Sequence, residues 1–114
     1  MQVLSQVSHS EKIRRINDAC RRSFTGCRIV VTAAFAELDA KTKAIVLHQV
    51  QTFKDFDEGN DPHHEHDFGC IEHDGEKFFF KFDYYDETLQ YGSDDPSDQA
   101  KTRRVLTIML ASDY

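Results

Sequence analysis

Apolar and polar positions alternate most regularly between residues 66 and 86, and this alternation predicts two β-strands. The pair Asp74-Gly75 interrupts the alternation, and it is a favoured pair for a two-residue hairpin turn of type I′. Side chains along a strand point alternately to its two faces, so every second residue after the turn shares a face. We assign to the core the face that carries the rings of Phe78, Phe80, Phe82 and Tyr84.

The turn also predicts which residues of the two strands lie opposite each other. Gly69 falls opposite Phe80, where the absence of a side chain leaves room for the ring. His66 falls opposite Asp83, and a carboxylate beside an imidazole can fix the tautomer of the ring. We interpret this second pair as a structural cross-strand contact, with a general acid or base as the alternative.

Apolar residues at intervals of three and four predict helices in three other segments. The first helix begins at Ser10, a suitable N-cap, and the second begins near Asp39. The third spans residues 99–112, although the apolar run 105–110 also fits a buried strand. Its length and its capping residues favour the helix.

The remaining patterns complete a prediction of fold class. Residues 28–35 are β-branched and apolar on both faces, which is typical of a central strand, and residues 89–91 can add a short strand. Strands and helices do not alternate strictly, which indicates an α+β fold. We expect a small antiparallel sheet, made of the hairpin 66–86 and the strand 28–35, packed against about three helices in a single domain, residues 1–114.

The composition limits the class of protein. The 114 residues include 14 Lys and Arg but 20 Asp and Glu, which gives a net charge of −6. Because neutralising phosphates requires a surplus of basic residues, direct DNA binding is not expected. No apolar run is long enough to span a bilayer, and the N-terminal segment lacks the order of a signal peptide. We therefore expect a cytoplasmic protein without a membrane partner.

Three cysteines, Cys20, Cys27 and Cys70, occur without a C-x-x-C pair. This odd number argues against a disulfide framework and against a zinc ribbon. We expect three reduced thiols that are mostly buried.

Several histidines lie close together just before the predicted hairpin. Imidazole and carboxylate groups are the usual ligands of divalent transition metals, so His64, His66 and Asp83 form a candidate metal site, with Glu65 or Tyr84 as proton carrier. The segment does not match the H-E-x-x-H motif, and no phosphate-binding glycine loop or nucleophile motif is present. We therefore assign no catalytic residue, metal or cofactor, and keep a small metal-dependent hydrolase or nuclease as the alternative.

Acidic residues are concentrated in the predicted loops and at the hairpin ends. A concentrated negative field can attract a basic protein surface or copy a row of phosphates. We therefore predict a protein-binding surface, with a merely solubilising surface as the alternative. Its candidate binding residues are Glu65, Asp67, Asp83, Tyr85, Asp86, Asp94 and Asp95.

Arginines line the polar face of the first predicted helix and recur near the C-terminus. We expect a solvated basic face that balances the acidic residues, either within the chain or in a second copy of it. The second arrangement would make the protein a homo-oligomer. The residues are Arg14, Arg15, Arg21, Arg22, Arg103 and Arg104.

Several short segments together resemble a known family. They are Ile16-Asn-Asp18 with Phe24-Thr-Gly26, Asn60-Asp-Pro with Glu65-His-Asp-Phe-Gly69, Lys81 with Asp83-Tyr-Tyr-Asp86, and Arg104-Val-Leu-Thr-Ile-Met-Leu-Ala111. In this combination the chain resembles a group of short bacterial proteins classed as domain of unknown function 3768. The resemblance implies a single-domain organisation and no particular activity. By analogy with small acidic proteins of phages and plasmids, we expect an inhibitor of the anti-CRISPR or anti-restriction type, a nucleic-acid mimic that binds the basic surface of a defence complex.

Overall fold

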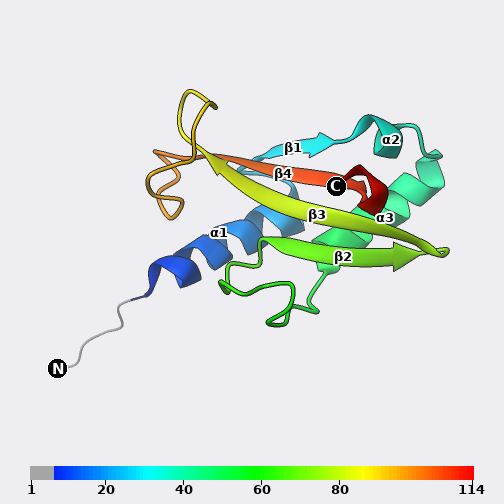
Figure 1. Ribbon diagram of the computed structural model, residues 1–114, viewed down its shortest axis with the longest axis horizontal. Helices are drawn as coiled ribbons and strands as arrows, with labels where there is room; N and C mark the ends of the chain where they lie inside the picture. The colour runs from blue at the N-terminus through cyan, green and yellow to red at the C-terminus, as the bar shows by residue number, and fades with distance from the viewer. Residues whose placement is uncertain (1–6) are drawn as a thin grey trace.

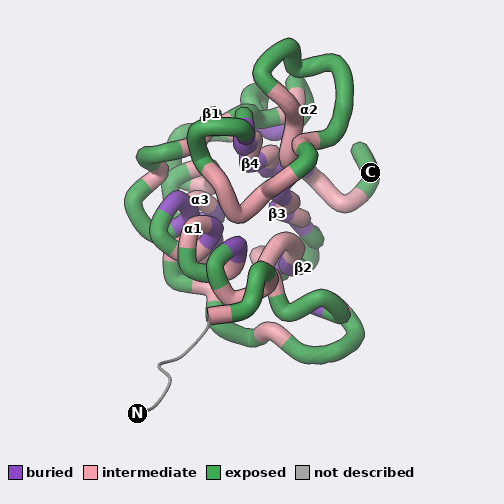
Figure 2. Tube along the Cα trace, turned by 90° about the vertical axis from the view of Figure 1, so that its left-hand side faces the viewer, coloured by how far each residue is buried: buried purple, intermediate pink, exposed green. Residues whose placement is uncertain are grey.

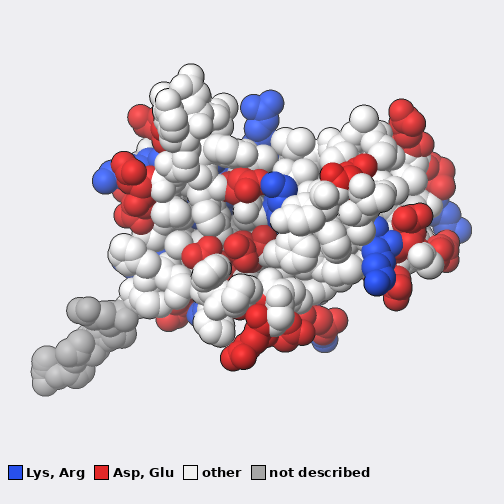
Figure 3. Space-filling view, in the orientation of Figure 1, with Lys and Arg blue, Asp and Glu red and all other residues white. Residues whose placement is uncertain are grey.

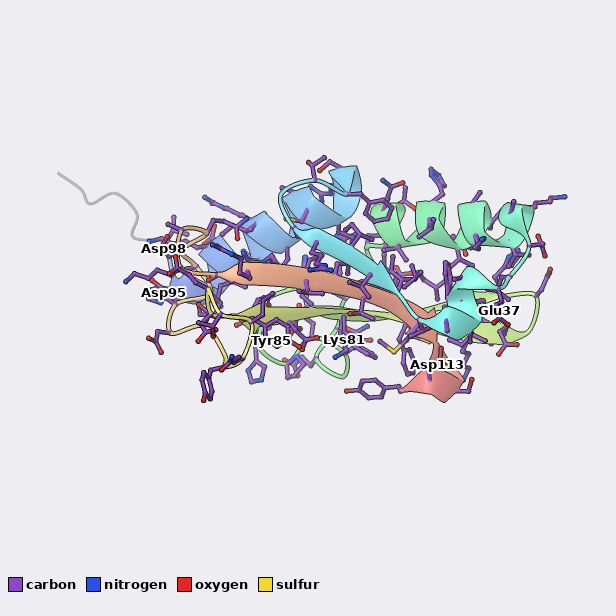
Figure 4. The ribbon with its side chains drawn as sticks, turned by 90° about the horizontal axis from the view of Figure 1, so that it is seen from above. Glu37, Lys81, Tyr85, Asp95, Asp98 and Asp113 are labelled. Atoms are coloured by element: carbon purple, nitrogen blue, oxygen red, sulfur yellow. The ribbon has the colours of Figure 1, made fainter. Side chains whose placement is uncertain are left out.

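A computed structural model describes residues 7–114 of the chain and shows an α+β fold, as predicted. A four-stranded sheet carries the helices α1 and α3 on one face, and the opposite face carries no helix longer than the 3-10 turn η1 (Figures 1 and 4). The elements are α1 (His9–Ser23), β1 (Arg28–Val31), α2 (Ala33–Ala36), α3 (Ala40–Thr52), β2 (Phe68–His73), β3 (Glu76–Tyr85), β4 (Arg103–Leu110) and η1 (Ala111–Asp113).

The strands lie in the order β1-β4-β3-β2. Strand β1 runs parallel to β4, whereas β4 with β3 and β3 with β2 are antiparallel. The sheet is therefore mixed, which corrects the expectation of an antiparallel sheet. Within residues 7–114, no helix is long and apolar enough to cross a membrane.

The predicted hairpin is confirmed as β2 and β3. Asp74 and Gly75 form its turn with φ angles of 52° and 78°, the two positive values that a type I′ turn requires. Gly69 pairs with Phe80, as predicted. A Cβ atom on this glycine would lie 2.4 Å from the Phe80 ring, so only glycine allows the ring to pack there.

The predicted row of rings faces the helices and forms the centre of the core. Phe78, Phe80 and Phe82 are at most 5% exposed, and Tyr84 is half-buried. Figure 2 shows buried positions where α1 and α3 meet β3 and β4. The core also contains Phe35, Val46, Val50, Ile71, Leu106 and Ile108.

The C-terminal segment is a strand, so the prediction of a helix over residues 99–112 is wrong. Strand β4 lies between β1 and β3 and pairs with both. Ile108 and Met109 are both buried although they face opposite sides of the sheet. The run 105–110 is mostly apolar on both faces of the strand, and a short run of this kind is indistinguishable from a helix by periodicity.

The strand predicted over residues 28–35 is shorter and differently placed. Strand β1 ends at Val31 and lies at the edge of the sheet, where Val30 and Val31 are each 37% exposed. Thr32 then caps the short helix α2, so the following alanines leave the sheet. The strand expected at residues 89–91 is absent from the described part of the chain, where a single bridge joins Tyr85 and Gly92.

The first and second predicted helices are confirmed as α1 and α3. The N-cap of helix α1 lies two residues earlier than expected, because Ser8 rather than Ser10 accepts the capping hydrogen bond from the N–H of Glu11. Asp39 caps α3 as predicted, accepting from the N–H of Thr42 at 2.8 Å.

Candidate binding site

The loop between α3 and β2, residues 53–67, folds against α1 and is held by side-chain caps. The carboxylate of Asp57 accepts backbone N–H groups two and three residues further on, at 2.9 and 3.0 Å. Asp61, which is 3% exposed, accepts the N–H groups of Glu65 and His66, each at 2.9 Å. Aspartate side chains that accept backbone N–H groups in this way stabilise turns in segments that contain no helix or strand.

His66 joins this loop to α1. Its Nδ1 lies 2.8 Å from the carboxylate of Asp18 and its Nε2 lies 3.7 Å from Asp61, while the ring stacks on Phe56 at 3.8 Å between centroids. The predicted pairing of His66 with Asp83 is therefore wrong. Both ring nitrogens thus face carboxylates of the protein, and these contacts join the loop to α1.

Arg21 ties the start of the loop to the same helix. It is 1% exposed, and its Nη1 donates to the carbonyl groups of Val50 and Phe53 at 3.0 and 2.9 Å. Its Nη2 donates to Asp18 at 2.9 Å, and its guanidinium lies over the Phe56 ring. The carboxylate of Asp18 therefore serves both the arginine and the histidine, which couples the two ends of the loop.

A second polar network positions Glu65. The hydroxyl of Tyr84 donates to Glu65 Oε1 at 2.8 Å and accepts from Asn17 Nδ2 at 2.8 Å. The same Nδ2 donates to the carbonyl of Glu65 at 3.0 Å, and Asn17 Oδ1 accepts from Arg104 Nε at 2.7 Å. Tyr84 of β3 and Asn17 of α1 thus hold Glu65 in place. Arg104 of β4 in turn holds Asn17.

The predicted solvated basic face is wrong in two of its members. Arg21 and Arg104 are 1% and 3% exposed, and Arg104 gives further hydrogen bonds to the side chain of Gln99 and the carbonyl of Pro96. Arg15 contacts Glu11 within its own helix. Arg21 and Arg104 therefore stabilise the fold and belong to no surface.

Glu65 and Asp67 are carboxylates in an unfavourable environment. Burial raises the pKa of both, and the negative charges of neighbouring carboxylates add to the effect: Asp67 and Asp61 for Glu65, Asp61 and Asp83 for Asp67. Within residues 7–114, no Lys, Arg or His nitrogen lies within 4.0 Å of either carboxylate. Perturbed carboxylates of this kind are typical of functional sites.

The backbone beside Glu65 is also strained. His64 and His66, on either side of it, have φ angles of 59° and 55°, a region that residues other than glycine rarely adopt. Such conformations persist only where surrounding contacts enforce them, and they cluster at functional positions. Here the enforcing contacts are those of Asp61 and Asp18, together with the hydrogen bond from Arg14 to the His64 carbonyl at 3.2 Å.

Asp83 and Tyr85 lie on the face of the sheet opposite α1 and α3. Figure 4 shows Tyr85 and Lys81 on the side of the strands away from α1 and α3. Lys81 donates to Asp83 at 2.7 Å, which raises the pKa of the lysine. Both residues of this pair are about one-third exposed, with side-chain values of 32% and 34%.

The outer acidic residues belong to the loop between β3 and β4, and two of them form its turns. Asp86 accepts from the N–H and hydroxyl of Thr88, and Asp95 accepts from those of Ser97. These hydrogen bonds lower the pKa of both carboxyl groups. Asp94 is exposed and lines a shallow depression together with Asp86.

Acidic side chains gather in more than one place on the surface. In the view of Figure 3 they lie at both ends of the molecule and along its lower edge, so the net charge is not confined to one end of the hairpin. Glu37 and Asp113 lie at the end opposite Asp95 and Asp98 (Figure 4). We call the group at the Tyr85 end the acidic rim; its members are Glu65, Asp67, Asp83, Asp86, Asp94 and Asp95.

The three residues of the candidate metal site do not come together. His66 contacts Asp18 and Asp61, whereas Asp83 pairs with Lys81. His64 is exposed. In the part of the chain that the structure describes, no group of three or more His, Cys, Asp or Glu side chains is arranged to hold a metal ion.

The site depends on residues that the sequence analysis did not single out as functional, chiefly Asn17 and Asp18. One signal was available for Asn17: it lies four residues after Ile13 and three before Cys20, on the apolar stripe of the first helix. A polar residue in such a stripe is buried and needs hydrogen-bond partners. No local signal shows that those partners are Tyr84 and Arg104, because they are distant in sequence.

The fold and site together define a small α+β protein whose loop carboxylates are held by buried polar contacts. A family model described as "Protein of unknown function (DUF3768)" matches residues 31–113. The chain therefore belongs to the DUF3768 family, which confirms the resemblance. No curated protein and no solved structure matches the chain.

Proposed function

We propose that the protein is a non-catalytic binding protein whose acidic rim captures a basic surface of a partner protein. The observation that carries this proposal is the state of Glu65 and Asp67. Both are partly buried, both are crowded by other carboxylates, and neither has a cationic contact within residues 7–114. A cationic side chain of a partner would relieve this repulsion on binding.

The rim is held in place before binding, which favours recognition over catalysis. Glu65 is fixed by Tyr84 and Asn17, and the loop that carries it is fixed by Asp18 and Asp61. A preorganised group loses little conformational entropy when a partner binds. The histidine of the site, the residue type most often used for proton transfer, is held between two carboxylates.

The proposed partner is a nucleic-acid-handling protein. Carboxylates at fixed positions can replace phosphates as counterions for the Arg and Lys side chains of a nucleic-acid-binding surface. An inhibitor of a defence complex, of the anti-restriction or anti-CRISPR type, would act in this way. We place the protein in the cytoplasm, where its three free cysteines would stay reduced.

The test uses a fluorescent oligoarginine peptide as the probe and follows its anisotropy over a series of salt concentrations. The variant Glu65→Gln with Asp67→Asn should bind the peptide about tenfold more weakly than the parent and show a smaller dependence on salt. The matched control Glu37→Gln with Glu76→Gln removes the same charge from exposed positions outside the rim. Equal weakening in both variants would show that the net charge, and not the rim, binds the peptide.

A second stage tests the mimicry of nucleic acid. Duplex DNA should compete with the protein for the oligoarginine peptide, and the rim variant should lose this competition while the control retains it. If the parent and the peptide form a complex that DNA joins without displacing either component, the rim does not occupy a phosphate-binding surface.

A further inference from the structure

Two cysteines that the proposed function does not use lie together where α1 turns into β1. Cys20 is in the last turn of α1, and Cys27 directly precedes β1. Between them, Phe24 adopts a left-handed conformation with φ 56° and donates its N–H to the Cys20 carbonyl at 2.7 Å, and Gly26 has φ 81°. The chain therefore reverses direction within a few residues and returns Cys27 to the side of Cys20.

Cys27 is partly buried and packs against the core cluster that contains Cys20. The Cys27 thiol hydrogen-bonds to the Cys20 sulfur, which lowers the pKa of Cys20 to about 7 and raises that of Cys27. The turn packs directly against the sulfur, since a Cβ atom on Gly26 would lie 3.4 Å from Cys20 Sγ. A thiol that donates to a neighbouring sulfur favours the thiolate form of that sulfur.

A buried positive charge faces this pair. The guanidinium of Arg104 acts on both sulfur atoms and favours their ionised forms. Arg104 is 3% exposed, and its hydrogen bonds go to the neutral oxygens of Asn17, Gln99 and Pro96. Among residues 7–114, it has no carboxylate within 4.0 Å, so its charge is not neutralised locally.

Both cysteines line openings toward the surface, although Cys20 itself is only 3% exposed. Cys20 lines an open cavity of about 420 Å³, and Cys27 lines a neighbouring one of about 350 Å³. Gly26 and Gln99 border both cavities, so the thiol pair lies on the wall between them. Hydrogen peroxide is little larger than water and fits either cavity.

We propose that Cys20 and Cys27 are a peroxide-reactive dithiol that closes to a disulfide. The Cys20 thiolate attacks one oxygen of hydrogen peroxide; the O–O bond breaks, hydroxide leaves, and a sulfenic acid forms. The sulfur of Cys27 then attacks the Cys20 sulfur; the S–S bond forms, the S–O bond breaks, and the departing oxygen leaves as water with the remaining thiol proton. Two thiols and one peroxide thus give one disulfide and two waters, and a dithiol reductant reverses the change.

The third cysteine supplies the control. Cys70 is exposed on β2, and its thiol is not part of this pair. In the variant Cys70→Ser, an equimolar amount of peroxide should lower the intact mass by about 2 Da, the mass of two hydrogens, and a non-reducing peptide map should link residues 20 and 27. The variant Cys27→Ser should give a sulfenic acid at Cys20 that dimedone traps.

Two outcomes would overturn the proposal. In the variant Cys70→Ser, a gain of oxygen without loss of hydrogen would show that the two sulfur atoms do not join. In the parent, oxidation of Cys70 before the pair would show that exposure rather than the thiol pair governs reactivity. Both of these measurements need only the parent and the variant Cys70→Ser, so the proposal can be tested even if Cys27→Ser does not fold.

Discussion

Strand β3 presents the same face to two different environments along its length. Its first half packs Phe78 and Phe80 against apolar side chains, and Phe80 lies edge to face with Phe53 at 5.2 Å between centroids. Its last core-facing residue, Tyr84, instead meets the polar side chains of Asn17 and Arg104. One sheet face is thus divided between an apolar and a polar core.

The two halves contribute differently to the stability of the fold and to the position of the loop. Burial of the apolar half stabilises the fold without directional requirements. The polar half gains little net free energy, because its groups exchange hydrogen bonds with water for hydrogen bonds with one another. Its effect is positional: it holds Glu65 and the loop 53–67 in one arrangement. The apolar half explains why the chain folds, and the polar half explains where the acidic rim lies.

The largest effect should come from the apolar half. Phe80→Ala removes a ring that is 0% exposed and leaves a cavity, which should lower the free energy of unfolding by about 3–5 kcal/mol. Urea denaturation followed by circular dichroism measures this change. Phe80→Leu, which retains most of the volume, should cost clearly less. Equal losses for both would mean that the cost comes from loss of the aromatic ring itself and not from the volume of the cavity.

A smaller loss should come from the polar half. Asn17→Ala leaves Arg104 Nε and the Tyr84 hydroxyl without their buried partner, which should cost about 2–3 kcal/mol. Tyr84→Phe removes one hydroxyl and should cost about 1 kcal/mol. The double variant should lose less than the sum, because both changes break one network. Strict additivity in the same urea experiment would show that the two residues act independently.

The smallest effect concerns the pH dependence of the rim. The folded-state pKa values of Glu65 and Asp67 are raised, so protonation of these groups favours the folded protein. Their stabilising contribution is present below the ordinary carboxyl range, about pH 4, and is lost as the pH rises through the raised values. The variant Glu65→Gln with Asp67→Asn cannot ionise there, so its stability relative to the parent should increase with pH.

Denaturation at several pH values measures that difference. The control Glu37→Gln with Glu76→Gln should show no comparable trend, since both residues are exposed. A rim variant whose stability relative to the parent stays constant, or falls as the pH rises, would contradict the assignment of Glu65 and Asp67 as destabilised carboxylates.

Local patterns were sufficient for much of the fold. The turn at Asp74-Gly75 predicted the register of β2 and β3, and helical spacing predicted α1 and α3. The same reasoning failed at β4, because the run 105–110 is mostly apolar on both faces and its residues do not alternate. It also failed at His66, because the regular pairing of the hairpin begins only at Phe68 and His66 has a positive φ angle and contacts Asp18 of α1 instead.

By itself, the amino-acid sequence determined the hairpin, the ring row on its core face, two helices, the α+β class and the family. These features follow from interactions between residues close in the chain, or from the side-chain periods of two residues in strands and 3.6 residues in helices, which are visible in the sequence. Only the tertiary structure decided that Asn17 meets Tyr84 and Arg104, that Asp18 meets His66, and that Cys27 meets Cys20 beside a buried guanidinium. Such contacts depend on how separate elements pack, and a polar side chain carries no local mark of the distant partner that satisfies it.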